Sequence, residues 1–168
     1  MPIKNLHDLY HDQLQDLYSA LGQSLGIVGD LSHAAQSPEL AEALIAGQNG
    51  ISRGLETLAS LCAEHGIDPQ GEHCKGMEGI VVEARKHALD ADFADEDTQD
   101  AAIITQYQRM AHYAIAGYGC VRTFANRLGL DDQGARLQEE LDQTWEGDKK
   151  MTALAEGGIN AAAMGKVE

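Results

Sequence analysis

The stretch Gln106-Tyr107-Gln108-Arg109-Met110-Ala111-His112-Tyr113-Ala114-Ile115-Ala116-Gly117-Tyr118-Gly119 lies in the middle of the longest segment with helical apolar periodicity. It mixes aromatic rings, amides and one histidine with very small residues. A helix of this composition lines a polar interior, a cofactor or a closely packed neighbour. The composition of the other helices must decide among these three.

The length of the chain indicates how many domains it forms, and its net charge excludes some classes of binding partner. The chain has 168 residues, which is enough for one domain with its own core. The net charge of −15 argues against a nucleic-acid binder and against docking on an anionic membrane. The sequence has no apolar run of about 18 residues that would span a membrane, and we expect no secretory signal at Met1–Asp8. Cys62, Cys74 and Cys120 are predicted to be reduced thiols of a cytoplasmic protein.

Apolar residues at steps of three and four predict helices, and no segment alternates as a strand would. Four long helices are expected at about residues 5–34, 38–66, 98–129 and 131–154, and a short one at about 75–91. Ser37 and Thr98 are the expected N-caps of the second and third long helices. The acidic run 90–97 is predicted to be a solvated loop.

Four long helices with a short helix in the crossover between the second and the third predict an all-α fold. This long crossover is the connectivity of a ferritin-like four-helix bundle. We expect residues 1–156 to form the bundle and residues 157–168 to form a loosely ordered tail.

Several blocks of the chain are similar to one known family. The segment Asp8–Ala20 resembles the opening of the ferritin-like stress proteins typified by YciE and YciF. Further blocks agree in order: Ser37-Pro38-Glu39-Leu40, Cys74–Gly79, Asp100–Ile104, His112-Tyr113 with Ile115–Gly119, and Asp148–Ala155. The resemblance spans nearly the whole chain. It implies a bundle that is usually dimeric, a stress-related role, and a centre whose carboxylates and histidine suit two metal ions.

The chain departs from this family at the positions that the metal centre requires. Where the family has Tyr-Ser-Ala-Glu, the chain has Tyr18-Ser19-Ala20-Leu21, and a His-Leu-Glu-Glu-Thr block is replaced by Gly47-Gln48-Asn49-Gly50-Ile51. A Glu-His-Tyr-Glu block becomes Ala111-His112-Tyr113-Ala114, and a run of glutamates becomes Asp142-Gln143-Thr144. The positions of the lost site are therefore Leu21, Gly47, Asn49, Gly50, Ala111, Ala114 and Gln143, with Asp142 the only inward carboxylate expected to remain.

This loss predicts a protein without the family's metal chemistry. A pair of divalent ions requires about four carboxylates, which Leu, Gly, Ala and amide side chains do not supply. We therefore expect no catalytic residue, no metal and no cofactor. The preferred hypothesis is a non-catalytic structural or interaction protein, a homodimer through helix packing, with an unidentified protein partner.

Two alternatives stay open. A relocated metal site would draw on His112, Asp142 or Glu78, or on a cluster of Cys62, His65, His73 and Cys74, whose residue types permit zinc. Against the cluster, the side chains of His73 and Cys74 are adjacent and reach one ion only if the backbone there is irregular. His112 has no acidic partner close in sequence and fits a hydrogen-bonded core histidine better than a ligand.

The second alternative is a small-ligand binder. Glycines interrupt the predicted helices at Gly22, Gly26, Gly29, Gly47, Gly50, Gly54, Gly117 and Gly119. Each costs a helix interior about 0.5–1 kcal/mol relative to alanine. The preferred interpretation is close approach between helices. The other is that Gly47, Gly50, Ala111 and Ala114 leave a cavity, with His112 and Tyr113 as the polar remnants of its wall.

Overall fold

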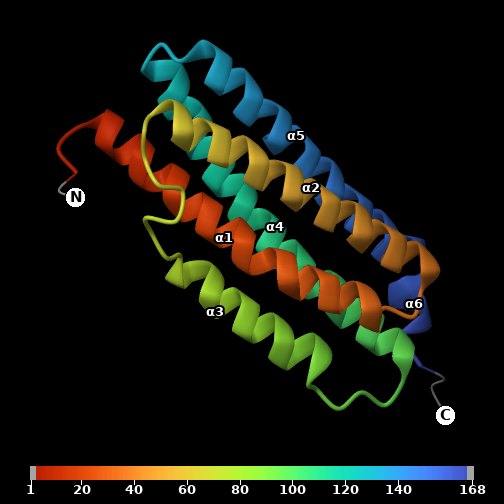
Figure 1. Ribbon diagram of the computed structural model, residues 1–168. Coiled ribbons are helices and arrows are strands. Elements are labelled where there is room, and N and C mark those ends of the chain that lie inside the picture. The colour runs from red at the N-terminus through yellow and green to blue at the C-terminus, as the bar shows by residue number, and fades with distance from the viewer. Residues whose placement is uncertain (1–2, 166–168) are drawn as a thin grey trace.

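Four long helices and one shorter helix make up most of residues 3–165, the part of the chain that the computed structural model describes (Figure 1). They are α1 (Leu6–Ala34), α2 (Pro38–Glu64), α3 (Lys75–Ala84), α4 (Glu96–Arg127) and α5 (Asp131–Leu154). A π-helical turn, η1 (Arg85–Leu89), extends α3, while η2 (Ala155–Ile159) and α6 (Asn160–Ala162) extend α5. Residues 3–165 contain no strand, which confirms the predicted all-α class.

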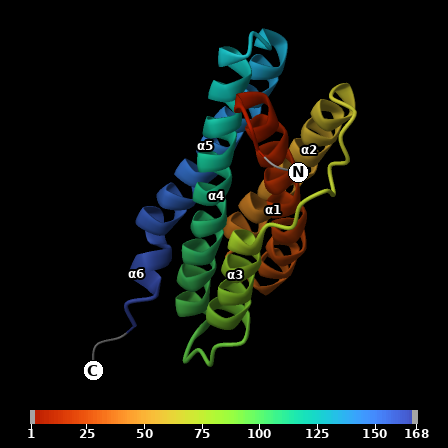
Figure 2. The same ribbon diagram turned by 90° about the vertical axis from the view of Figure 1, so that its left-hand side faces the viewer.

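The helices pair as two hairpins. α1 packs along α2, α4 packs along α5, and the hairpins meet through α1 against α4 and α2 against α5. The crossover from α2 to α4 carries α3, which lies against the outer side of α1 and α4 (Figures 1 and 2). A ferritin-like bundle with an extra helix in its crossover was predicted, and this arrangement confirms it.

Local side chains explain where the helices begin. The hydroxyl of Ser37 accepts a hydrogen bond from the backbone N–H of Leu40, as predicted for an N-cap. The prediction that Thr98 caps α4 is wrong, because Asp95 takes that role. Its carboxylate accepts from the backbone N–H of Thr98 at 2.7 Å and from the Thr98 hydroxyl at 2.9 Å. An aspartate is a strong N-cap, and the acidic residues of the first turn add a favourable interaction with the helix dipole.

The core consists of two clusters, one in each half of the bundle. The first contains Leu31, Leu40, Leu44, Ile103 and Met151 among others. The second contains Tyr10, Leu14, Leu58, Val121 and Leu137 among others. Each cluster draws on all four long helices, so the two ends of the bundle are well packed. The region between them is the centre, where the family resemblance places a metal site.

The chain remains helical beyond the predicted end of the bundle. A loosely ordered tail was expected from residue 157, yet the path stays helical to Ala162 with a kink at Gly158. Leu154 and Ile159 pack against the first core cluster, and the alanines that follow are good helix formers. Residues 166–168 of that expected tail lie outside the described residues.

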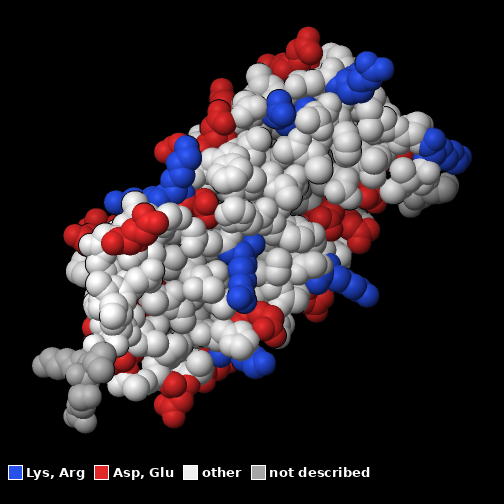
Figure 3. Space-filling model, turned by 180° about the vertical axis from the view of Figure 1, so that it is seen from behind, with Lys and Arg blue, Asp and Glu red and all other residues white. Residues whose placement is uncertain are grey.

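Charged side chains are scattered over the face of the molecule shown in Figure 3, most of which consists of other residues. On the face opposite that of Figure 1, acidic and basic groups are interspersed and form no broad basic patch (Figure 3). None of the helices in the described part of the chain combines the length and the apolar character that crossing a membrane requires.

Candidate functional site

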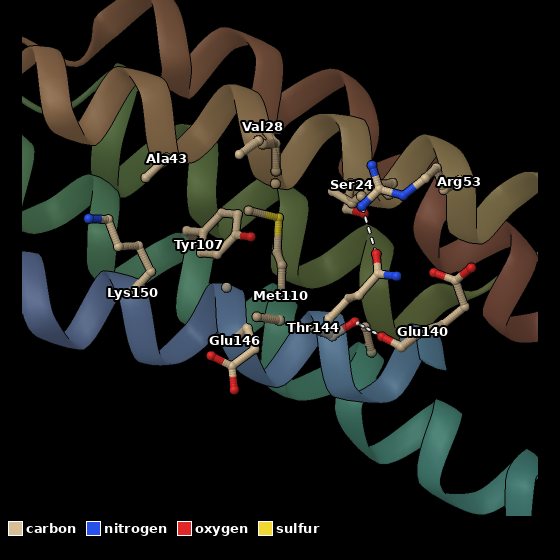
Figure 4. A pocket seen from close by; sticks show the side chains of 18 of the residues that line it. Ser24, Val28, Ala43, Arg53, Tyr107, Met110, Glu140, Thr144, Glu146 and Lys150 are labelled. Carbon is tan, nitrogen blue, oxygen red and sulfur yellow. Dashed lines mark hydrogen bonds between the residues drawn. The ribbon is translucent and has the colours of Figure 1, made fainter. Parts of the chain in front are cut away.

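A cleft of about 810 Å³ opens at the centre of the bundle, between α2 and α5. Its floor comes from α1 and α4, the two helices opposite the opening. Figure 4 shows the side chains of Tyr107 and Met110 on α4 projecting into the space between α2 and α5, with Val28 of α1 above them in this view. The stretch of α4 quoted first above therefore lines a cavity.

Six of the seven positions assigned to the lost metal site line this cleft: Leu21, Gly47, Gly50, Ala111, Ala114 and Gln143. Asn49 does not, because it is exposed on the outer side of α2. Positions from all four long helices thus converge on one space. They bring to it apolar or small side chains and one amide.

The floor of the cleft is mainly apolar, and its polar groups are the hydroxyls of Tyr107, Tyr118 and Ser24, of which Ser24 donates to the backbone carbonyl of Leu21. Burial, and then the charge of Asp148, raises the pKa of Tyr107 to about 12. Burial, and then the charge of Glu140, also raises the pKa of Tyr118. Both phenols therefore stay protonated near neutral pH and can donate a hydrogen bond.

Polar groups gather at the mouth of the cleft. Arg53 of α2 donates a 2.6 Å hydrogen bond to Gln143 Oε1 of α5, which ties the two edges of the opening together. The carboxylates of Glu39, Glu42 and Glu146 also border the opening. The rim is acidic overall, in keeping with the net charge of the chain.

Two further carboxylates of α5 line the cleft, the predicted Asp142 and also Glu140. Asp142 is exposed and accepts a hydrogen bond from Gln138. Glu140 is the more buried of the two, with 9% of its surface exposed and a 2.7 Å hydrogen bond from the Thr57 hydroxyl. Its position three residues after the buried Leu137 was the available signal, because residues three apart share a helix face.

His112 and Tyr113 do not belong to the cleft, and the interpretation of them as remnants of its wall is wrong. The His112 side chain is 55% exposed, and its Nε2 lies 3.1 Å from Asp148 Oδ1, so it is not a core histidine. Its acidic partner comes from α5 and was therefore not visible near it in the sequence. The Tyr113 hydroxyl points toward α3 and α1, where it contacts Cys74 Sγ at 2.9 Å and donates to Asp16 at 3.4 Å.

The cysteine–histidine zinc cluster is also wrong. His65 contacts Gln133, His73 pairs with Glu78 at 2.9 Å, and Cys74 contacts Tyr113. In addition, burial raises the pKa of Cys62 to about 11. Among residues 3–165, the potential ligand atoms of three or more such groups converge only at His7, His11 and His65, of which the sequence argument had weighed His65 alone.

The glycines have mixed roles. A Cβ on Gly29, Gly54 or Gly117 would meet a side chain of the neighbouring helix, as close approach predicts. A Cβ on Gly22, Gly26 or Gly119 would meet nothing within 4 Å, so close approach does not explain those three.

Comparison with known proteins agrees with the resemblance predicted from the sequence blocks. The model of a family described as a domain of unknown function (DUF892) matches residues 5–164. The protein YciF of Escherichia coli strain K12 is 29% identical over 167 residues, covering 99% of both chains. The crystal structure of the E. coli stress protein YciF has a TM-score of 0.87 at 28% identity and covers 94% of this chain and 99% of that one. YcfI, a candidate structural protein from Rhodopseudomonas palustris, has a TM-score of 0.83 at 28% identity, covering 89% and 94%.

Proposed function

The chain belongs to the DUF892 family, and on that premise we propose that it is a non-catalytic, stress-related member whose bundle centre holds a small apolar molecule in place of a metal pair. The stress-related part rests on its relative YciF, which is described as a stress protein. The ligand-binding part rests on one observation, the cleft that six of the lost-site positions line.

The chemistry of these positions supports the absence of a metal pair. Two divalent ions bring four positive charges to a site, and anionic oxygen ligands must balance them. Leu21, Ala111 and Ala114 face the cleft with no donor atom at all. Two of the carboxylates that line the cleft accept hydrogen bonds within the protein, Glu140 from Thr57 and Asp142 from Gln138.

The lining also indicates the class of ligand. The volume of about 810 Å³ falls within the range of small-molecule sites. Apolar walls favour an apolar body, and the hydroxyls of Tyr107 and Tyr118 favour a hydrogen-bond acceptor on it. The acidic rim of Glu39, Glu42 and Glu146 disfavours an anion. The ligand class is therefore an uncharged, mainly apolar molecule with an acceptor group.

Filling the cleft tests the proposal. Nile red, an uncharged apolar dye, is expected to bind one per chain with enhanced fluorescence. Ala111→Leu projects a larger side chain into the cleft and should weaken dye binding at least about tenfold, since about 1.4 kcal/mol of lost contact is a factor of ten. The matched control is Ala116→Leu, the same change at an exposed position of α4, which should bind dye as the unmodified protein does. A second filling variant, Gly50→Leu, starts from a site where only Arg53 Nη2 lies within 4 Å of an added Cβ, at 3.7 Å.

Two outcomes contradict the proposal. Equal dye binding by folded Ala111→Leu and Gly50→Leu would show that the cleft is not the binding site. Elemental analysis that finds two metal ions per chain, both displaced by Ala111→Leu, would show that a metal pair still occupies the centre. The homodimer that the family resemblance implies stays a prediction, and light scattering on the purified chain measures it.

A further inference from the structure

Three histidines meet at the end of the bundle where α1 begins and α2 ends. His7 and His11 lie one turn apart on α1, and His65 is the C-cap of α2. One ring nitrogen from each lies within 4.8 Å of the others. The ring centroids are 4.4 Å apart for His7 and His11 and 4.6 Å apart for His11 and His65. This cluster is far along α1 and α2 from the central cleft and independent of the function proposed for it.

The central ring of the cluster has an unsatisfied atom. Nε2 of His11 is buried from solvent and has no hydrogen-bond partner among the described residues. A buried polar atom without a partner costs about 1–3 kcal/mol, and native structures rarely leave one. Burial, and then the neighbouring His65 and His7, lowers the pKa of His11, while Asp8 raises it. In the neutral form, one ring nitrogen of an imidazole carries a lone pair that can bind a metal ion.

The surroundings of His65 fix which of its nitrogens is free. The carboxylate of Glu64 accepts a 2.8 Å hydrogen bond from Gln133 Nε2, which identifies the amide nitrogen. The Tyr10 hydroxyl donates to Gln133 Oε1 at 2.9 Å, so that oxygen is an acceptor. His65 Nε2 lies 2.9 Å from the same oxygen and must therefore carry the hydrogen. This leaves the lone pair on Nδ1 of His65, and a hydrogen bond from the other ring nitrogen is typical of metal-binding histidines.

We propose that His7, His11 and His65 form a three-imidazole site for a divalent transition-metal ion such as zinc, with the fourth position open to water. Imidazole suits zinc, copper and nickel, whereas calcium and magnesium prefer oxygen ligands. Nitrogens bound to tetrahedral zinc at about 2.0–2.1 Å lie about 3.3 Å apart. The three rings must close by at most about 1.5 Å from their present separation. His7 is exposed and free to make that adjustment.

A bound ion would join the first turn of α1 to the end of α2. The ion would also give His11 Nε2 the partner that it lacks. The nearby carboxylate of Asp8 and the strongly negative charge of the chain favour a cation over an anion at this end. Residue spacing gives no signal for this site, because His65 is 54 positions from His11 and only the fold brings them together.

Zinc titration tests the proposal on the full-length protein after chelator treatment. Calorimetry should find one tight zinc per chain, and cobalt in place of zinc should give the visible absorption of a tetrahedral nitrogen site. His7→Gln and His11→Gln should each weaken binding at least about tenfold. Gln133→Leu, which removes the partner of His65, should weaken it about 10–100-fold. His33→Gln, an exposed histidine at the other end of α1, is the matched control and should leave binding unchanged.

The results of the zinc experiments do not depend on whether the central cleft binds the dye. Absence of stoichiometric zinc binding, or equal binding by the His7→Gln/His11→Gln double variant, overturns the site. If His11→Gln does not fold, His7→Gln still decides, because its side chain is exposed. As a measurement on the unmodified protein, zinc should shift the ring-nitrogen NMR signals of these three histidines and leave those of His33 and His87 in place. Ala111→Leu should bind zinc normally whatever its effect on the dye.

Discussion

Gln133 is the residue that connects the end of α2 to the start of α5. Its side chain accepts from Tyr10 and contacts His65 through Oε1, and donates to Glu64 through Nε2. Only 7% of its surface is exposed, so these hydrogen bonds are largely shielded from water. Arg136, one turn further along α5, donates to the same Glu64 at 2.6 Å. A single carboxylate therefore holds this end of the bundle together through two residues of α5.

This arrangement makes the stability of the protein depend on pH through Glu64. The hydrogen bond from Arg136 is the largest cause that lowers the pKa of Glu64 below its ordinary value of 4.5. The folded state thus holds the carboxylate ionised to lower pH than the unfolded state does. The stabilising contribution is complete above pH 4.5 and is lost as the pH falls through the lower folded value.

Urea unfolding of Glu64→Gln and of the unmodified protein, both in chelator, checks this. We expect the variant to be less stable at pH 6, and the difference in free energy of unfolding to shrink steadily toward pH 3. Glu56→Gln, at an exposed position of the same helix, controls for the removal of one negative charge from α2. If Glu64→Gln lowered the free energy of unfolding by the same amount at pH 6 and at pH 3, the ionised Glu64 would not be stabilised by its hydrogen bond from Arg136.

At the scale of elements, two of the three glycines of α2 lie where tyrosine side chains of α4 approach the helix. A Cβ on Gly47 would lie 2.5 Å from the Tyr107 hydroxyl and 3.0 Å from two ring carbons. Gly54 faces the Tyr118 hydroxyl in the same way. Gly50, between them, has only the end of the flexible Arg53 side chain within 4 Å. The same residue type therefore permits close approach at two positions and leaves open space at the third.

Alanine substitution separates these two roles of glycine. Gly50→Ala should raise the free energy of unfolding by about 0.5–1 kcal/mol, because alanine is the better helix former and nothing rigid opposes its methyl group. Gly47→Ala gains the same propensity but must displace the Tyr107 ring, so it should be neutral or destabilising. Urea midpoints of the two variants measured together provide the comparison. An equal gain at both positions would mean that the Tyr107 ring is free to move away from α2.

The helices were largely predictable from the sequence, but the contacts between side chains of different helices were not. Apolar periodicity located every long helix, and Ser37 with Pro38 located the start of α2. The start of α4 was placed too late because Asp95 is embedded in an acidic run that resembles a loop. Contacts between distant segments had no local signal, as the pairing of His112 with Asp148 shows. The position of the cleft was predictable only because the family resemblance aligned four helices at once.

At the scale of the whole molecule, a carboxylate also joins the two helical hairpins at the end opposite Gln133. Asp100 of α4 is 2% exposed. Its Oδ1 accepts from the backbone N–H of Gln36 at 2.9 Å, and its Oδ2 accepts from that of Ser37 at 2.8 Å. These two N–H groups lie in the turn between α1 and α2, where no helical carbonyl is available to them. Sequence analysis identified Asp100 only as part of a block that resembles the family, and did not predict this role.

Replacing Asp100 should therefore weaken the whole bundle rather than one helix. Hydrogen bonds to a charged group contribute about 1.5–3 kcal/mol each, and Asp100→Ala removes two and leaves buried donors behind. We expect a loss of about 3 kcal/mol or more in the free energy of unfolding, measured in urea by circular dichroism. Asp97→Ala, an exposed acid in the first turn of the same helix, is the matched control and should cost less than about 1 kcal/mol. A loss of less than about 1 kcal/mol for Asp100→Ala would contradict this role, because it would show that water satisfies the two N–H groups of the turn.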